Sequence, residues 1–281
     1  MAEQKLGPAE LAAFGRYLRE EERSPGTIEK YLRDAGAFAG WLAGRAVTRE
    51  TAAEWKESLR RAGYAPVTVN AMLAAVNTLF RSLGWEQCRV RFLKIQRRLF
   101  REDARELTRP EYERLVAAAR DQGRERLALV METMGATGIR VGEVRYITVE
   151  ALARGRAEIA LKGKIRTILL PDKLCRKLLR YAGREEIAAG EVFRTRRGGT
   201  WCRKQIWAEM KALCARAGVA PTKVFPHNLR HLFARAFYRV SRDVAKLADV
   251  LGHSSIETTR IYLISTGVEH SRQLERLHLV C

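Results

Sequence analysis

The stretch Pro226-His227-Asn228-Leu229-Arg230-His231 is the most informative part of the chain. Pro226 is typical of the first position of a helix, because its fixed φ suits a helix start. On that helix His227 and Arg230 are three residues apart, so both point the same way near the N-terminus. The unpaired N–H groups of a helix N-terminus favour an anion. The stretch therefore predicts a site for an anion, formed by an imidazole and a guanidinium.

A second stretch, Leu251-Gly252-His253-Ser254-Ser255, leads to Tyr262. Gly252 is expected to end one helix, and the next helix, over 255–264, carries the tyrosine. On one continuous helix His253 and Tyr262 would lie on opposite sides, and the break at Gly252 lets them converge. A tyrosine on a helix is more often a packing residue, so Tyr262 is a candidate only because of its neighbours.

These residues fit few kinds of chemistry. His227 and His231 are four residues apart, a spacing that suits a metal, but they lack the acidic residue of an HExxH motif and a third ligand. We therefore expect no metal site. A tyrosine with two histidines and an arginine instead suits attack on a phosphodiester whose charge is held by cations.

The charge of the chain indicates a polyanionic partner. Its 281 residues carry a formal net charge of +20. Residues 1–103 have a net charge of +5, and residues 104–281 have a net charge of +15. Because the surplus extends over a whole segment, nucleic acid is favoured over an anionic membrane surface. The length is sufficient for two modest domains.

The cysteines and the N-terminus bear on the cellular compartment. Five cysteines show neither a CxxC motif nor a zinc-type spacing with histidine, which favours free thiols in a reducing cytoplasm. The residues after Met1 lack the apolar region of a secretory signal. No apolar run reaches the length of a membrane span. A cytoplasmic protein without a membrane partner is therefore expected.

Helical periodicity dominates the first hundred residues. Four amphipathic helices are separated by start signals such as Ser24-Pro25 and by glycines. We assign residues 1–96 to a small helical bundle whose aromatic residues form its core. The arginines and lysines that follow predict a short helix and then a basic linker over 97–106, suited to tracking a phosphate backbone. The alternative is a solvated connector.

A second domain over 107–281 is expected to begin at a capping box of Thr108 and Glu111. Arg140 and Glu143 lie one turn apart on one of its helices. Two alternating segments, 157–161 and 165–170, read as strands around a Gly163-Lys164 turn. Further helices are expected over 115–119, 127–134, 172–182, 203–217, 226–240, 242–251, 255–264 and 270–277. The predicted fold is mainly α with a small β-hairpin, an α+β fold.

Five blocks follow one another along the chain: Ala136-Thr137-Gly138-Ile139-Arg140-Val141-Gly142-Glu143, Lys162-Gly163-Lys164, Pro226-His227-Asn228-Leu229-Arg230-His231, Leu251-Gly252-His253-Ser254-Ser255 and Thr258-Thr259-Arg260-Ile261-Tyr262. They span most of residues 108–265, and each block alone would be weak evidence. In this order they resemble the tyrosine recombinases of the phage integrase family, including its Xer-like members. The resemblance implies a C-terminal catalytic domain. The N-terminal bundle is similar to the SAM-like core-binding domain of the family in position, size and helical content.

The resemblance also implies roles for individual residues. Tyr262 is the nucleophile, which leaves a 3′-phosphotyrosyl link and a free 5′-hydroxyl. Arg140 and Arg230 hold the non-bridging oxygens of the phosphate, and Glu143 orients Arg140. His227 performs general acid/base catalysis for a phenol, a group whose ordinary pKa is about 10.

Three further positions complete the implied site. His253 supplies a hydrogen bond to the phosphate, and His231 is a supporting residue. A lysine protonates the departing 5′-oxygen, and the family pattern selects Lys162, just before the hairpin glycine. The hairpin is shorter than usual, with Arg166 four residues after Lys162, so Lys164 is an alternative. No metal or other cofactor is required, because arginine, histidine and lysine hold the charge.

The implied activity is site-specific cleavage and rejoining of duplex DNA, for integration, excision, inversion or dimer resolution, in a bacterium, a phage or a mobile element. Members of the family act as homotetramers on two paired sites, and accessory DNA-bending proteins would be further partners. The implied location is the cytoplasm, at the nucleoid. A short amphipathic tail helix over 268–280 is expected to pack on its own domain or on a neighbouring protomer.

Two other classes of function are considered. A type IB topoisomerase shares the tyrosine chemistry but relaxes supercoiled DNA as a monomer, and the short bundle and the five blocks argue against it. A non-catalytic relative would bind DNA without forming a covalent adduct. The presence of a candidate at every catalytic position argues against that alternative.

Overall fold

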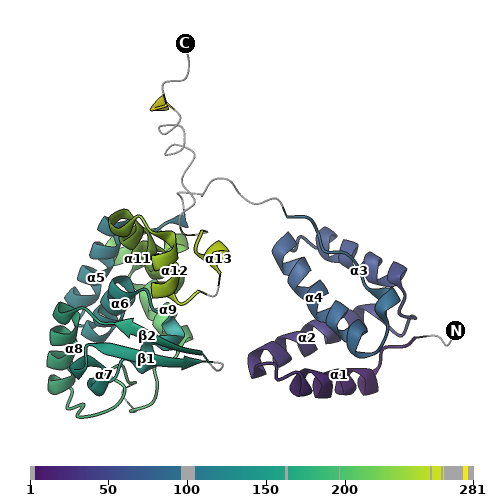
Figure 1. Cartoon of the computed structure of the whole chain (residues 1–281), viewed down its shortest axis with the longest axis horizontal. Coiled ribbons are helices and arrows are strands. Elements are labelled where there is room, and N and C mark those ends of the chain that lie inside the picture. The colour runs from purple at the N-terminus through teal and green to yellow at the C-terminus, as the bar shows by residue number, and fades with distance from the viewer. Residues whose placement is uncertain are drawn as a thin grey trace. The chain divides into compact units, whose positions relative to one another are not determined.

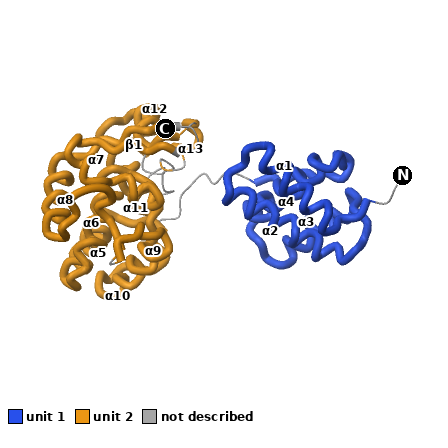
Figure 2. Tube along the Cα trace, turned by 90° about the horizontal axis from the view of Figure 1, so that it is seen from below, with its two compact units in different colours: residues 1–97 blue, residues 98–281 orange. Residues whose placement is uncertain are grey.

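The computed structural model describes residues 4–95, 105–161, 164–195, 197–253, 255–260, 262 and 275–277, apart from the side chains at positions 161 and 164. The chain divides into two compact units, residues 1–97 and 98–281 (Figure 2). Both are built mainly of helices, and the second also holds one small sheet (Figure 1). The predicted α+β class is confirmed. Within the described residues, no helix combines the length and the apolar character needed to span a bilayer.

The first unit is a bundle of four α-helices around an aromatic core. The helices are α1 (Pro8–Glu20), α2 (Pro25–Leu42), α3 (Arg49–Arg61) and α4 (Pro66–Ser82). Phe38 is fully buried, and its ring centroid lies 4.9 Å from that of Trp55 and 5.8 Å from that of Phe80. The prediction that these aromatic residues form the core is confirmed. Edge and tilted contacts of this kind stabilise packed rings.

The segment after the bundle differs from its prediction. Only a 3-10 turn, η1 (Glu86–Cys88), follows α4, and residues 89–95 are not helical. Two asparagines on α4 hold this segment. The amide of Asn77 donates to the carbonyl of Val90 over 2.9 Å and accepts from its N–H over 3.1 Å, and Asn70 does the same with Leu93 at 2.9 and 2.8 Å. Because these amides satisfy the backbone groups, the segment needs no helix of its own. Most of the predicted linker over 97–106 lies outside the described residues.

The second unit is organised around α6, which packs against four other helices. Its elements are α5 (Arg109–Asp121), α6 (Glu125–Thr137), η3 (Val141–Tyr146), α7 (Val149–Ala153), β1 (Arg156–Leu161), β2 (Lys164–Leu169), α8 (Asp172–Arg184), α9 (Arg203–Ala212), α10 (Cys214–Ala217), η4 (Pro221–Lys223), α11 (Pro226–Ser241), α12 (Val244–Leu251) and α13 (Ile256–Arg260). The helix predicted over 203–217 is interrupted at Leu213. The predicted tail helix lies outside the described residues, except for residues 275–277.

The small sheet is an antiparallel hairpin of β1 and β2. Its register pairs Ile159 with Arg166 and Leu161 with Lys164, so Lys164 belongs to β2 and not to the predicted Gly163-Lys164 turn. Along the hairpin, side chains alternate between a buried face and a solvent-facing face, as expected for half-buried strands. Ile159 and Ile168 are buried, and Ile165 faces solvent. Arg166 therefore lies on the inward face of β2, next to the carboxyl-terminal helices.

Candidate active site

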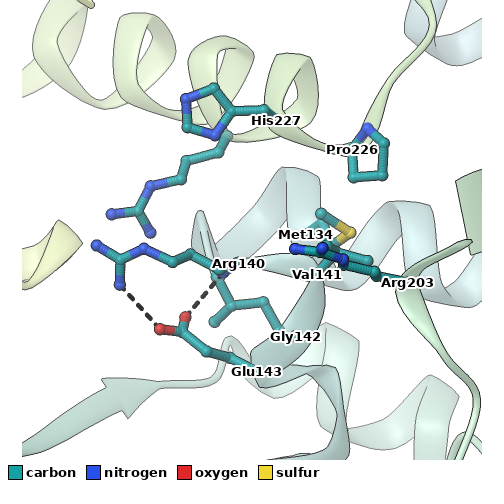
Figure 3. Close-up of a pocket in the computed structure, with 10 residues that line it drawn as sticks. Met134, Arg140, Val141, Gly142, Glu143, Arg203, Pro226 and His227 are labelled. Atoms are coloured by element: carbon teal, nitrogen blue, oxygen red, sulfur yellow. Dashed lines mark hydrogen bonds and ion pairs between the residues drawn. The ribbon is translucent and has the colours of Figure 1, made fainter. Parts of the chain in front are cut away.

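Arg140 is placed by the end of α6. Gly138 ends this helix with a φ of +66°, and Arg140 then caps η3. A 3-10 turn replaces the α-helix predicted here, but it still brings Glu143 back over Arg140. Glu143 accepts the Arg140 N–H and its guanidinium, each over 2.8 Å (Figure 3). Glu143 is buried whereas 46% of the Arg140 side chain is exposed, so the carboxylate fixes a guanidinium that still faces solvent.

Arg230 is held by the carboxyl ends of two helices. It projects from the first turns of α11, and only 1% of it is exposed. Its guanidinium donates to the carbonyl of Gly138, after α6, over 2.5 Å and to that of Leu251, in α12, over 2.7 Å. Burial lowers the pKa of Arg230, and the nearby charge of Arg140 lowers it further. Arginine nevertheless stays charged in proteins, so a buried cation with a fixed orientation results.

His253 lies between Arg230 and α13. Its Nε2 is 2.9 Å from a guanidinium nitrogen of Arg230, and its Nδ1 is 2.8 Å from the hydroxyl of Thr259. A guanidinium can only donate, so Nε2 accepts and the ring proton sits on Nδ1. Burial, followed by the charge of Arg230, lowers the pKa of His253 to about 4. The ring is therefore neutral at neutral pH.

Tyr262 is buried among three histidines, with 2% of it exposed. Its hydroxyl lies 3.5 Å from Nε2 of His227, and its ring stacks on that of His253 with a centroid separation of 5.6 Å. The edge contact with the His231 ring is closer, at 4.6 Å. The convergence predicted from the break at Gly252 is confirmed. Burial, then the charges of Arg230 and Arg140, lower the pKa of His227, which leaves it neutral and able to accept a proton.

The outer side of α11 holds the first described residues of the second unit. Asn228 donates to the carbonyl of Arg105 over 2.7 Å, and Arg235 donates to that of Leu107 over 2.7 Å. Glu106, between them, forms an ion pair with Arg235 and lies 3.7 Å from Nδ1 of His231. No local pattern selects Glu106, because its partners His231 and Arg235 lie more than a hundred residues away along the chain. It gives His231 an acidic neighbour.

A cavity of about 380 Å³ has Arg140, His227 and Arg230 among its lining residues. Figure 3 shows two of these lining residues, His227 on α11 and Arg140 below it. Arg203, at the start of α9, also lines it and was not among the predicted site residues. The charged side chains that line the cavity are three arginines and Glu143, so the lining carries a net positive charge, as expected for an anion site. Lys162 lies outside the described residues, as does the side chain of Lys164, so neither lysine is located.

Arg166 is a third residue that the sequence did not reveal. Its guanidinium donates to Glu143 over 2.7 Å and to the carbonyl of Leu251. Only 14% of the side chain is exposed. Burial lowers the pKa of Arg166, while the carboxylate of Glu143 raises it. The available signal was strand alternation, which placed an arginine on the inward face of β2 and so required a buried acceptor.

Comparisons with known proteins agree with this fold. The model of the phage integrase family matches residues 105–267, and the model of the phage integrase N-terminal SAM-like domain matches residues 11–87. The chain therefore belongs to the phage integrase family. It is a tyrosine recombinase, an enzyme that cleaves and rejoins DNA.

Relatives and solved structures point the same way. The chain is 28% identical to tyrosine recombinase XerA of Pyrococcus furiosus over 100% of this chain and 98% of the relative. It is 27% identical to tyrosine recombinase XerD of Vibrio cholerae over 90% of this chain and 89% of the relative. A lambda integrase tetramer bound to a Holliday junction has the same fold, with a TM-score of 0.74, 18% identity and coverage of 92% of this chain and 77% of that one.

Proposed function

We propose that this recombinase cuts one strand of a specific duplex site through Tyr262 and keeps the broken end as a 3′-phosphotyrosine. One observation carries the proposal: the Tyr262 hydroxyl lies 3.5 Å from His227, beside Arg230, which caps two helix ends. A buried tyrosine needs neither a base nor two cations for packing. Such neighbours are required when the phenol must attack a charged phosphodiester.

The two arginines act on the phosphate. Arg140 and Arg230 both line the cavity, so a phosphate within it meets two guanidinium groups. Charge develops on the non-bridging oxygens as phosphorus becomes five-coordinate, and donors already fixed in place stabilise it without reorganisation. Glu143 orients the Arg140 guanidinium, and the carbonyls of Gly138 and Leu251 orient the Arg230 guanidinium.

The covalent step is a transesterification. The Tyr262 oxygen attacks phosphorus while its proton passes to Nε2 of His227, and the bond from phosphorus to the 5′-oxygen breaks. The 5′-oxygen leaves with a proton from a hairpin lysine, for which Lys162 is the first candidate and Lys164 the second. The reverse attack by a 5′-hydroxyl rejoins the strand.

His253 contributes to phosphate binding. In the free protein its Nε2 accepts from Arg230. A phosphate that takes over this guanidinium frees Nε2, and a nearby negative charge raises the pKa of a histidine. His253 then becomes a donor to the phosphate. His231, packed between Glu106 and Tyr262, supports the position of the phenol.

The same proposal covers partners and organisation. We assign residues 1–96 to a DNA-binding bundle, 97–106 to a basic linker and 107–281 to the catalytic domain. The partners are paired recombination sites in double-stranded DNA and three further copies of the chain, with accessory DNA-bending proteins as additional partners. The lambda integrase tetramer on a Holliday junction supports this assembly. The location that suits such a protein is the cytoplasm, at the nucleoid.

The test uses nicked suicide duplexes built from inverted repeats in the DNA that flanks the gene. Wild type should give a protein–DNA band that survives denaturation, and Tyr262→Phe should bind the same duplex without that band. Binding without an adduct by wild type would favour the non-catalytic alternative. Relaxation of any supercoiled plasmid without site preference would favour the topoisomerase alternative.

A further inference from the structure

Arg166 connects two parts of the site that the chain keeps far apart. Glu143, its first partner, follows α6, and Leu251, its second partner, ends α12. Each of these two acceptors also receives a hydrogen bond from a second arginine. Glu143 also accepts from Arg140, and the Leu251 carbonyl also accepts from Arg230. Each of the two phosphate-binding arginines therefore shares one acceptor with Arg166.

The packing around Arg166 indicates that the neighbouring backbone is shaped to hold its side chain in this position. Gly252 follows Leu251 with a φ of +64°, and the Arg166 side chain crosses directly over it. A Cβ at Gly252 would overlap the Cδ of Arg166 and approach its Nη1 to 2.8 Å. The absence of a side chain at position 252 is thus what allows the guanidinium to reach the end of α12.

The sharing has an electrostatic consequence. Glu143 places one oxygen on the Arg140 guanidinium, at 2.8 Å, and the other on Arg166, at 2.7 Å. With one carboxylate divided between two cations, Arg140 is oriented without being fully neutralised. A guanidinium has donors on two sides and can bridge a carboxylate and a carbonyl, whereas a lysine ammonium is a single point charge.

We propose that Arg166 is a positioning residue for strand cleavage: it fixes Glu143 and the Leu251 carbonyl relative to each other and so aligns Arg140 with Arg230. The inference rests on the proposed function, because the alignment matters only for a phosphate that both arginines hold. Arg166 itself does not touch the phosphate. It acts through the acceptors it shares, and loss of that alignment weakens the stabilisation of charge as phosphorus becomes five-coordinate.

The experiment compares Arg166→Lys and Arg166→Met with Arg156→Lys and Arg156→Met. Arg156 lies on the same hairpin, in β1, but more than half of its side chain is exposed and its neighbour is the exposed Glu158. Single-turnover formation of the covalent adduct is measured with saturating protein on a suicide duplex that wild type cleaves. Both Arg166 variants should be slower by about 10- to 100-fold, with dissociation constants for DNA within about threefold of wild type. The Arg156 variants should match wild type in both.

A modified substrate separates positioning from general loss of structure. With a methylphosphonate at the scissile position one charged oxygen is gone, so aligned arginines matter less. The defect of Arg166→Lys should then shrink to less than about threefold relative to wild type on the same duplex. A defect of equal size on both substrates would overturn the proposal, as would wild-type rates for Arg166→Lys on the phosphate. If Arg166→Met does not fold, Arg166→Lys, which keeps the charge, carries the test.

Coupling to Glu143 gives an independent check. If Arg166 acts through the shared carboxylate, combining Arg166→Lys with Glu143→Gln should slow cleavage little more than the worse single variant does. Multiplication of the two defects would contradict the shared acceptor. Failure of wild type to form any adduct would instead refute the proposed function, so the two failures are distinguishable.

Discussion

Arg230 donates to Nε2 of His253 over 2.9 Å, and burial together with this contact keeps the histidine in its neutral form. Proton uptake by His253 in the folded state would place a cation against a buried cation. The unfolded chain has no such restriction. The site therefore links the stability of the protein to pH.

Acidification should destabilise the protein through this histidine. The folded pKa of His253 is about 4, below the ordinary value of about 6.5. Between these values the unfolded state binds the proton and the folded state does not, so stability is present above pH 6.5 and is lost as pH falls toward 4. Urea unfolding at pH 7.5, 6 and 5 should show a smaller loss for His253→Asn than for wild type. Identical pH dependence of the two proteins would contradict the neutral histidine.

Glu143→Gln should reduce stability because it leaves the half-buried Arg166 with a neutral partner. Breaking a buried pair from one side costs about 3 kcal/mol or more. The matched control is Glu158→Gln, which removes an exposed carboxylate 3.9 Å from Arg156 and should cost less than about 0.5 kcal/mol. Urea unfolding at neutral pH measures both. Equal costs at the two positions would mean that Glu143 is not a buried ion-pair partner.

Gly252→Ala and Gly155→Ala separate backbone strain from contact with Arg166. Both glycines have a positive φ, +64° and +66°, so an alanine costs about 1 kcal/mol at either. Nothing lies within 4 Å of a Cβ at Gly155, whereas a Cβ at Gly252 displaces Arg166. Gly252→Ala should therefore be the less stable variant, and it alone should slow adduct formation, by about tenfold or more. Equal stability and equal rates of adduct formation in the two variants would show that the Arg166 side chain moves aside at little energetic cost.

Arg203→Ala should lower the salt dependence of DNA binding. Arg203 lines the cavity at the start of α9, where it can neutralise one phosphate. Loss of one such contact reduces the slope of log K against log salt concentration by about 0.9. Arg184→Ala is the control, because Arg184 pairs with Glu125 and does not line the cavity. Titrations at several salt concentrations check this, and an unchanged slope would remove Arg203 from the DNA interface.

Local signals predicted most of the fold and the residues that meet in the site. Pro226, Gly252 and the capping box at Thr108 act within a few residues of themselves, so their effects can be inferred from sequence alone. The blocks that resemble the family then indicated that Arg140, His227 and Tyr262 belong together.

The remaining parts depend on tertiary contacts that no local pattern records. Arg166 meets Leu251 across 85 residues of chain, and Glu106 meets Arg235 across 129. The segment 89–95 is held extended by the asparagines of α4, so its basic composition did not determine its structure. The turn at Arg140 is a 3-10 helix, and Glu143 joins it to tertiary structure by accepting from both Arg140 and Arg166.

The partners of Arg230 have one more consequence. Two backbone carbonyls at helix ends and a neutral imidazole surround its charge. Helix carboxyl ends carry about half a negative charge each, enough to tolerate a buried cation without a carboxylate beside it. Within the described residues no carboxylate contacts Arg230, so an incoming phosphate meets no competing anion there. It displaces only the neutral imidazole of His253, so the enzyme avoids the cost of breaking an ion pair each time it binds DNA.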